Sequence, residues 1–197
     1  MVSYKTIKII DFLRKEKLPV VSINLLRSFT GLTNKQSLAS YINSLIRYKI
    51  LEKAEKGKYL VKDNLTNDFV VANLLYSPSY ISLETALNLY GILSQFPIEI
   101  SSVTTKRKKS KTIGGKLYVY YHIDRKFFWG FEKKGNALMA LPEKALLDAI
   151  YFTSKGIKKT AVGDLDLSFI NKKVFSDFSK KFPKTKILSN LVKSVLQ

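Results

Sequence analysis

The sequence contains no cysteine, and histidine occurs once, at position 122. Disulfide bonds and thiolate catalysis are therefore excluded, and so are zinc sites built from several cysteine and histidine ligands. Acidic side chains are also scarce, because 15 Asp and Glu stand against 34 Lys and Arg, which leaves a net charge of +19. Such an excess of positive charge points to a polyanionic partner.

Long apolar segments are missing as well. No run of about 18 apolar residues occurs, and residues 1–19 lack the apolar core and the small-residue cleavage site of a signal peptide. We therefore expect a soluble cytoplasmic protein without a membrane partner. Hydrophobic residues still make up 46% of the chain and aromatic residues 12%, which is enough for one or two domains with a buried core.

A polar stretch with turn-forming residues, 61–68, separates two segments of different pattern. We place the domain boundary there and expect domains at residues 1–66 and 67–197. The first carries 13 basic and 5 acidic side chains, and the second carries 21 and 10. Because both are basic, charge alone does not show which of them holds the binding site.

The first part of the N-terminal domain predicts two helices. Ile7, Ile10 and Leu13 lie at helical spacing and define the apolar face of the first helix. Ser22 can cap a second, short helix, and Gly31 can end it, because glycine readily adopts the left-handed conformation of a helix C-terminus.

A third helix is expected to begin after Thr33, because Thr33 and Gln36 have the spacing of a capping box. Four apolar residues form its buried stripe, namely Leu38, Ile42, Leu45 and Ile46. A β-hairpin follows over residues 50–61, with Gly57 at the turn. Helix, helix, tight turn, helix and hairpin in this order predict a winged helix-turn-helix, whose third helix enters the major groove of DNA.

The predicted DNA-binding residues lie in the first turns of the third helix and at the tip of the wing. The outer face of that helix is polar but not acidic, so its side chains can approach base edges and phosphates. The alternatives are a protein-interaction domain of the same fold and a helical domain whose polar face is merely solvated. The candidate residues are Thr33, Asn34, Lys35, Gln36, Ser37, Ser40, Tyr41, Lys56 and Lys58.

The C-terminal domain is predicted to contain a small, mostly antiparallel sheet with flanking helices. Segments 98–104, 116–123 and 127–131 are rich in β-branched and aromatic residues, which favours strands. Helices are expected after Ser82, from Pro142 onward, and over residues 171–181 and 184–196. The predicted fold class is therefore α+β with two domains.

A basic loop is predicted between the first two of these strands. Residues 104–116 hold six basic side chains and no acidic one. Closely spaced cations release counterions from a nucleic-acid backbone, so the loop suits phosphate contacts, and a mobile, solvated hairpin loop is the alternative. The candidate phosphate-contacting residues are Lys106, Arg107, Lys108, Lys109 and Lys111.

Patterns that could hold a metal ion or a phosphate are incomplete. Residues 114–116, Gly-Gly-Lys, lack the spacing of a phosphate-binding loop. Asp164 and Asp166 have the spacing of a nucleotidyltransferase metal site, but no upstream Gly-Ser pair accompanies them, which favours acids that lead into helical turns. Asp124 and Glu132 have the order of a nuclease motif, but the segment between them is too short to place both at one site reliably.

The remaining catalytic candidates also favour structural roles. His122 has no cysteine or hydroxyl nucleophile to pair with, so we expect a structural histidine. The dense aromatic residues of segments 118–121 and 127–129 could stack on bases, but core packing of a small sheet is favoured. We therefore predict a protein that is not an enzyme, with no catalytic residue, no metal site and no cofactor.

The sequence resembles the AbiEi antitoxin family over approximately residues 1–190. The resemblance combines the winged helix, residues 79–87, the strand ending at 103–104, the basic loop and residues 140–148. Its most specific part is 142–148, Pro-Glu-Lys-Ala-Leu-Leu-Asp. The family consists of bacterial and archaeal transcriptional autorepressors encoded beside nucleotidyltransferase-like toxins, in systems associated with abortive phage infection.

The resemblance implies an N-terminal domain that binds double-stranded operator DNA at repeats. It also implies a C-terminal domain that neutralises the cognate toxin, usually without a stable complex. On the helix that carries the motif, Ala145, Leu146, Ala149 and Ile150 form one apolar face. We expect that face to be packed and the charged motif residues Glu143, Lys144 and Asp148 to be solvated.

Two functions of other classes stay open. One is a ligand-sensing winged-helix regulator without a toxin partner. The other is a metal-dependent nuclease, in which Glu132 would be required for cleavage.

Overall fold

The computed structural model describes residues 4–62 and 67–197. The chain divides into two compact units, Met1–Leu75 and Tyr76–Gln197. This division comes later in the chain than the expected boundary between residues 66 and 67. Residues 63–66 of the predicted polar stretch lie outside the described residues.

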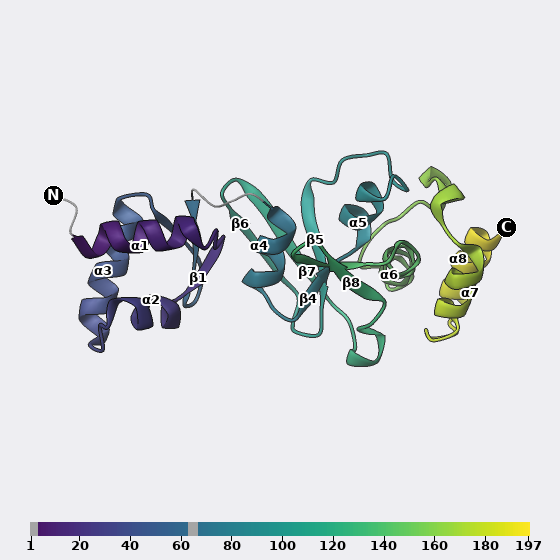
Figure 1. Cartoon of the computed structure of the whole chain (residues 1–197). Helices are drawn as coiled ribbons and strands as arrows, with labels where there is room; N and C mark the ends of the chain where they lie inside the picture. The colour runs from purple at the N-terminus through teal and green to yellow at the C-terminus, as the bar shows by residue number, and fades with distance from the viewer. Residues whose placement is uncertain (1–3, 63–66) are drawn as a thin grey trace. The chain divides into compact units, whose positions relative to one another are not determined.

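The N-terminal unit is a winged helix-turn-helix, as the order of elements predicts (Figure 1). A three-stranded antiparallel sheet, with strand order β1-β3-β2, joins its helices. The sequence patterns did not predict the first strand. The elements are α1 (Tyr4–Lys15), β1 (Val20–Ser22), α2 (Ile23–Thr30), α3 (Lys35–Arg47), β2 (Leu51–Glu55), β3 (Lys58–Val61) and α4 (Asp68–Leu75).

The predicted ends of α2 and the wing turn are confirmed. Ser22 Oγ accepts a hydrogen bond from the backbone N–H of Leu25, which satisfies a free donor of the first helical turn. Gly31 ends α2 with a φ of 68°, and Gly57 turns the hairpin with a φ of 73°. Both are conformations in which a side chain would be strained.

Two local predictions in this unit are wrong. Asn34, not Thr33, caps α3: its Oδ1 accepts from the backbone N–H groups of Gln36 and Ser37 at 2.8 and 3.1 Å. The capping box with Thr33 therefore does not form. In α1, Ile9 and Leu13 lie in the core, whereas Ile7 is half exposed, so the buried face is rotated from the one expected.

Helix α4 belongs to the N-terminal unit because it is fastened to the wing. Lys58 Nζ, on β3, donates to the carbonyl oxygens of Leu74 and Leu75 at the end of α4. Carbonyls at a helix C-terminus have no partner within the helix and carry partial negative charge, which an ammonium group neutralises. This attachment agrees with the division after Leu75.

The C-terminal unit is built on one six-stranded mixed sheet with strand order β6-β7-β5-β4-β9-β8. Three neighbouring pairs are antiparallel, and the pairs β4–β9 and β5–β7 are parallel. The strands are β4 (Ser79–Ile81), β5 (Glu99–Thr104), β6 (Lys109–Ile113), β7 (Lys116–His122), β8 (Phe131–Lys134) and β9 (Ala137–Ala140).

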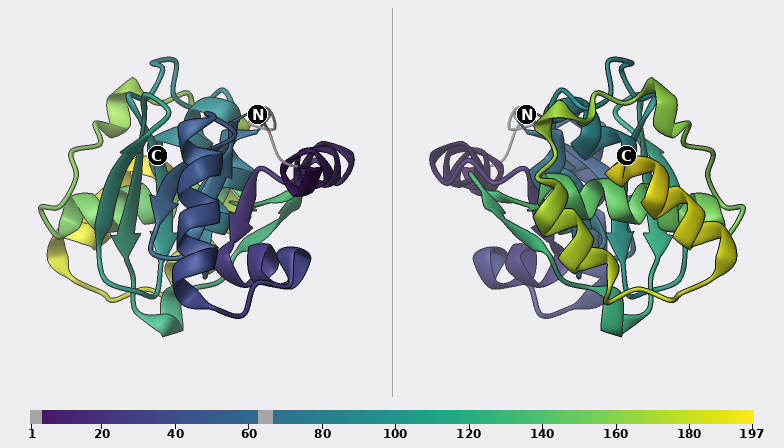
Figure 2. Two further views of the ribbon diagram at one scale, coloured as in Figure 1. Left: turned by 90° about the vertical axis from the view of Figure 1, so that its left-hand side faces the viewer. Right: turned by 90° about the vertical axis from the view of Figure 1, so that its right-hand side faces the viewer.

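Helices pack around this sheet. Helix α6 contacts α5, α7 and α8, and the last two helices also pack against each other (Figure 2). The α+β class of the chain is thus confirmed. The helices are α5 (Leu83–Leu89), η2 (Arg125–Phe127), α6 (Pro142–Ser154), η3 (Val162–Asp164), η4 (Leu167–Phe169), α7 (Lys172–Ser179) and α8 (Lys186–Leu196).

The structure alters two predictions for the sheet. Segment 127–131 is not one strand: Phe127 ends the short helix η2, residues 128–130 form a connection, and Phe131 begins β8. Residues 109–113 of the predicted basic loop form the edge strand β6, which pairs with β7. The glycines of residues 114–116 form the two-residue turn between these strands, with φ values of 58° and 76°, the geometry of a type I′ hairpin turn.

The aromatic residues of β7 belong to the core, as expected. Tyr118, Tyr120, Tyr121 and Phe127 are buried, which leaves their rings unavailable for stacking on bases. Trp129 packs edge-on against Phe178, with ring centroids 5.0 Å apart. Among the described helices, none combines the length and the apolar character needed to cross a membrane.

Candidate nucleic-acid interface

Helix α3 presents a polar face that is held firmly from behind. Leu38, Ile42 and Leu45 are buried in the core of the N-terminal unit, which fixes the helix against α1, α2 and the wing. The predicted residues Lys35, Gln36, Ser37 and Ser40 are exposed on the other side. The helix therefore has the two-faced arrangement that DNA reading requires.

Two shallow depressions lie along this helix. One, of about 670 Å³, is lined by Leu32, Tyr41, Ser44 and the predicted residues Gln36, Ser37 and Ser40. The other, of about 330 Å³, is lined by Ile23, Arg27, Lys35, Leu38, Ala39, Ile42, Asn43 and Tyr59. Three serines line the first depression, so a rigid partner can approach the helix closely there. Apolar side chains predominate in the second, with Arg27, Lys35 and Asn43 beside them.

The electrostatics of this region favour an anion. Residues 17–51, which contain α2, the turn and α3, hold five basic residues and no acidic residue. The first turn of α3 likewise contains no acid, so the positive end of the helix dipole is not neutralised there. Phosphate groups are stabilised at such a helix N-terminus.

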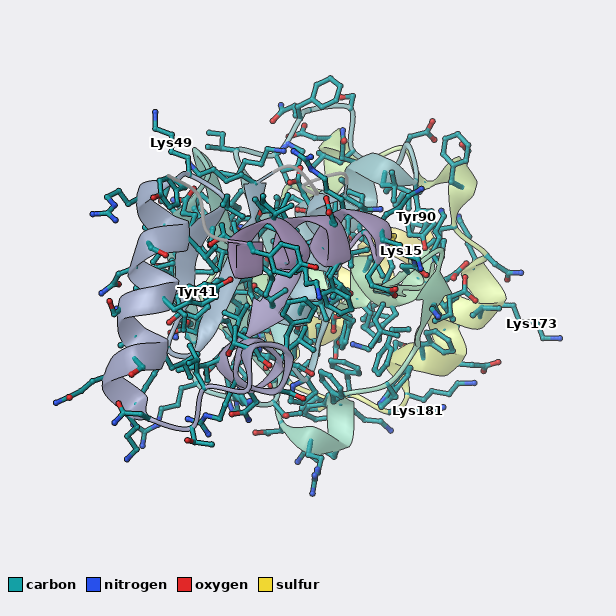
Figure 3. The ribbon with its side chains drawn as sticks, turned by 60° about the vertical axis from the view of Figure 1, so that its left-hand side comes forward. Lys15, Tyr41, Lys49, Tyr90, Lys173 and Lys181 are labelled. Carbon is teal, nitrogen blue, oxygen red and sulfur yellow. The ribbon has the colours of Figure 1, made fainter. Side chains whose placement is uncertain are left out.

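Thr33 and Tyr41 take positions different from the rest of the predicted set. Thr33 is exposed and precedes the cap, so its hydroxyl is free of the capping role expected for it. Tyr41 points from α3 toward α1 and packs against the core (Figure 3). Burial raises the pKa of Tyr41, and a hydrogen bond with Thr6 opposes that shift.

The two predicted lysines of the wing differ in their surroundings. Lys56, at the turn, is exposed, and its backbone N–H donates to Glu55 Oε1. Lys58 is half-buried and donates to the end of α4. Of these two side chains, only that of Lys56 projects from the wing without being bonded to α4.

The list of candidate DNA-binding residues omitted two members of this surface, Arg27 and Asn43. Both are exposed, and both line the same depression as Lys35. The spacing of Asn43 from Lys35, two helical turns, places it on the same strip and could have identified it. Arg27 comes from α2, and only the packing of α2 against α3 brings it to this position.

The basic residues of the C-terminal unit form a more ordered segment than expected. We call residues 106–111 the basic segment. Its backbone is tied down, since Tyr76 OH donates to the carbonyl of Arg107 at 3.2 Å and Lys106 N–H donates to Thr104 Oγ1 at 3.1 Å. Lys106 and Lys109 lie over the ring of Tyr76. A mobile, solvated loop would not make these contacts.

The structure does not bring the residues of the catalytic sequence patterns together in one site. Asp166 caps the helical turn η4 by accepting from Ser168 N–H at 3.0 Å, the role favoured for it. Asp124 follows β7, and Glu132 lies on β8, with three strands between those two in the sheet. His122 is exposed, with Nδ1 2.9 Å from the carbonyl oxygen of Lys106. Within residues 4–62 and 67–197, no group of three potential metal ligands comes together.

The charged residues of the 142–148 motif are buried, which corrects the expectation that they are solvated. Lys144 and Asp148 have no exposed surface and form an ion pair along α6. Lys144 Nζ also donates to Tyr80 OH at 2.8 Å, while Asp148 Oδ2 accepts from Tyr80 OH at 2.9 Å and Ser82 Oγ at 2.8 Å. Glu143 accepts from Asn171 N–H at 3.0 Å.

This buried network joins α6 to the strand β4 and to the start of α5. Burial is the largest influence on the pair: it lowers the pKa of Lys144 and raises the pKa of Asp148, while their mutual attraction acts in the opposite direction. Aromatic rings of Tyr80, Trp129 and Phe182 surround the ammonium group at 5.2–5.4 Å. The motif therefore holds the unit together from inside and presents no charged contact surface.

Comparison with known proteins adds no relative. No family model matches the chain, and a search of curated proteins found no match.

Proposed function

We propose that this chain is a cytoplasmic, DNA-binding transcriptional autorepressor and antitoxin of a bacterial or archaeal toxin–antitoxin system. In this proposal the N-terminal unit binds double-stranded operator DNA at inverted repeats. The C-terminal unit neutralises a nucleotidyltransferase-like toxin, whose antagonism need not involve a stable complex. The chain is not an enzyme and uses no cofactor.

The observation that carries the DNA-binding half is the surface of α3. A capped helix with exposed short polar side chains lies in a region of 35 residues, 17–51, that contains no carboxylate. Base edges are read by such side chains, and the absence of acids removes repulsion from the phosphates. The antitoxin half is supported by the resemblance to the AbiEi family at residues 142–148.

The basic segment is proposed to add electrostatic affinity for nucleic acid without choosing a sequence. Its side chains Lys106, Arg107 and Lys108 are exposed, and Lys109 and Lys111 lie two residues apart on the edge strand. Cations at such spacing match the repeat of phosphates along a backbone, which carries no sequence information.

The test is binding of the full chain to the DNA upstream of its own reading frame, against a scrambled duplex, over a series of salt concentrations. We expect salt-dependent binding to both and tighter binding to the upstream DNA. Replacing Gln36 and Ser40 together with alanine removes base-edge contacts, so the specific complex alone weakens, by about 1–3 kcal/mol per good contact.

The matched control is Asn190→Ala, which removes an exposed amide from α8 in the other unit. Its affinity for both duplexes should equal that of the wild type. If the upstream and scrambled duplexes bind equally, or if neither shows salt dependence, the DNA-binding proposal is wrong.

A further inference from the structure

The loop between α5 and β5 exposes apolar side chains to an unusual degree. Phe96 is 89% exposed and Ile98 is 95% exposed, with Pro97 between them. The loop is nevertheless held in place, because Asn88 Nδ2 donates to the carbonyl oxygens of Leu93 and Gln95 at 3.0 and 3.1 Å. A fixed loop that keeps two large apolar side chains in water is typical of an interaction site.

These side chains border a pocket of about 480 Å³ within the C-terminal unit. Apolar residues of the loop form one wall, and Ile157, which is 46% exposed, forms part of the other. Charged residues complete it. The lining residues are Glu84, Leu93, Gln95, Phe96, Pro97, Ile98, Glu99, Ile157, Lys158 and Lys159.

The charged part of the pocket is a lysine shared by two carboxylates. Lys158 Nζ lies 3.0 Å from Glu84 Oε2 and 2.9 Å from Glu99 Oε1, and 3.2 Å from Tyr121 OH. The contacts with Glu99 and Tyr121 are hydrogen bonds, whereas the contact with Glu84 is an ion pair. Glu84 Oε2 is buried and has no hydrogen-bond partner.

The carboxylates keep free acceptors. Among the residues that the structure describes, no hydrogen bond reaches either oxygen of Glu84 or Glu99 Oε2. A ligand that donates hydrogen bonds and carries positive charge matches these oxygens. A phosphate or carboxylate ligand, which only accepts, does not match them.

The charges that line the pocket balance one another. Two carboxylates, Glu84 and Glu99, stand against two ammonium groups, Lys158 and the exposed Lys159. The segment after η3 pairs with the loop, through a bridge between Leu93 and Leu165 and a hydrogen bond from Asp166 N–H to the carbonyl of Ile92 at 2.8 Å. In a chain with a net charge of +19, a surface without an excess of positive charge is a local exception.

The exposed side chains of Phe96 and Ile98 favour a ligand larger than a small amine. A small amine inside the pocket would leave the outer faces of Phe96 and Ile98 in water. A polypeptide segment that inserts a lysine or arginine between the carboxylates can cover both with its own apolar side chains. The dimensions of the surface therefore favour a protein partner over a free metabolite.

We propose that Phe96, Ile98, Ile157, Glu84 and Glu99 form a docking surface, the acidic–apolar surface, for a protein segment that carries apolar side chains next to a lysine or arginine. Its lining includes no residue of the basic segment, and it selects a partner of the charge opposite to nucleic acid. The chain would then have two kinds of partner, an anionic and a cationic one.

The experiment uses an array of random 15-residue peptides probed with the full-length chain and with the double variant Phe96→Ser, Ile98→Ser. Both side chains are exposed, so the variant should fold, and an unchanged thermal melt confirms it. Acidic peptides will bind both proteins through the positive charge of the chain. We expect the peptides bound by the wild type alone to combine Lys or Arg with Leu, Ile or Phe.

A peptide from that set is then titrated against each protein. Removing two large apolar contacts should weaken binding by more than about tenfold. Glu84→Gln should weaken it by about two- to fivefold, because the carboxylate is partly exposed. Ile187→Ser, which removes another exposed apolar side chain of the same unit, is the control and should leave the affinity unchanged.

Three results would overturn the proposal. The first is that the wild type and the double variant bind the same peptides. The second is that the peptides bound by the wild type alone contain no Lys or Arg. The third is self-association of the wild type that the double variant abolishes, since the occupant is then a second copy of the chain. Binding of DNA by the same variants is measured in parallel and should not change, which separates this surface from the proposed operator binding.

Discussion

Lys144 and Asp148 illustrate how one residue pair can be indispensable without touching a partner. Taking two charges out of water costs several kcal/mol, and their attraction offsets this cost only while both are present. The hydroxyl groups of Tyr80 and Ser82 complete the network by satisfying Asp148 Oδ2. Loss of one member therefore leaves a buried charge that nothing compensates.

We predict that Lys144→Met lowers the free energy of unfolding of the C-terminal unit by about 3–5 kcal/mol, because Asp148 is left unpaired. The double variant Lys144→Met, Asp148→Leu should lose less than the single variant. Urea unfolding followed by the fluorescence of Trp129, the single tryptophan, reports on this unit. The control is Lys133→Met on the exposed face of β8, and additive losses in the double variant would contradict the prediction.

Tyr121 couples the stability of the same unit to alkaline pH. Burial, and after it the hydrogen bond to Glu99, raises the pKa of Tyr121 to about 12. In the unfolded chain a tyrosine ionises at about pH 10. Between these values the folded state keeps a proton that the unfolded state loses, so stability that is fully present below about pH 10 is lost as the pH rises toward 12.

We therefore predict that Tyr121→Phe makes unfolding less dependent on pH between about 10 and 12. The remaining dependence comes from the other groups whose pKa values are raised in the folded state, namely Lys158, Tyr41, Tyr80, Tyr90 and Tyr151. Urea unfolding at a series of alkaline pH values measures the slope, with Tyr4→Phe, an exposed tyrosine, as the control. Equal slopes for wild type and Tyr121→Phe would show that the hydroxyl ionises at the same pH in both states.

At the scale of elements, the wing and α4 act together through Lys58. Its ammonium group is bonded to the last carbonyls of α4, whereas Lys56 projects from the turn. Lys56 can therefore reach a phosphate without breaking a contact, whereas Lys58 would first have to leave the carbonyl oxygens of α4.

We predict that Lys56→Ala weakens binding to all duplexes alike and lowers the slope of log K against log salt by about 0.9, the value for one phosphate contact. Lys58→Ala should change the slope less and should instead lower the stability of the N-terminal unit by about 1 kcal/mol, because α4 loses its attachment. Parallel salt titrations and thermal melts separate the two effects. The assignment fails if Lys58→Ala changes the slope as much as Lys56→Ala does.

Elements defined by local patterns were predictable, and those defined by distant contacts were not. The amphipathic helices and the Gly57 hairpin follow from residues close in sequence, so the winged helix could be derived. The three-residue strands β1 and β4 exist because they pair with β3 and β5, and no local period marks them. The observed cap of α3, Asn34, lies one residue after the predicted cap, Thr33, because both are good capping residues.

The same limit applies to the sites. A lysine and an aspartate four residues apart are the usual pattern of a solvated helix face, and only the approach of β4 reveals that Lys144 and Asp148 are buried. The polar face of α3 was predictable because it lies on one helix. The acidic–apolar surface was not, because it joins the loop after α5 with residues about 60 positions later, which only the fold brings together.

For the molecule as a whole, the division after Leu75 shows where the chain should be cut to test the two proposed functions separately. A fragment that ends at residue 66 lacks α4 and leaves Lys58 without its carbonyl partners. A fragment that begins at residue 67 carries a helix that packs against the other unit. Fragments 1–75 and 76–197 keep the internal contacts of each unit.

We predict that toxin neutralisation belongs to residues 76–197 and operator binding to residues 1–75. A full-length variant with Gln36 and Ser40 replaced by alanine should lose repression of its own promoter. Supplied from an independent promoter, it should still protect cells from the cognate toxin, because the C-terminal unit keeps its own core and its buried 142–148 motif. Growth rescue at matched protein levels measures protection, and a reporter gene measures repression.

The fragments sharpen this prediction. Residues 76–197 alone should protect, and residues 1–75 alone should bind operator DNA weakly and give no protection. Lys144→Met in the full chain serves as a folding control, since it should abolish protection by unfolding the C-terminal unit while DNA binding by the N-terminal unit persists. Protection by residues 1–75, or failure of a folded 76–197 fragment to protect, would mean that the chain opposes the toxin only by repressing transcription.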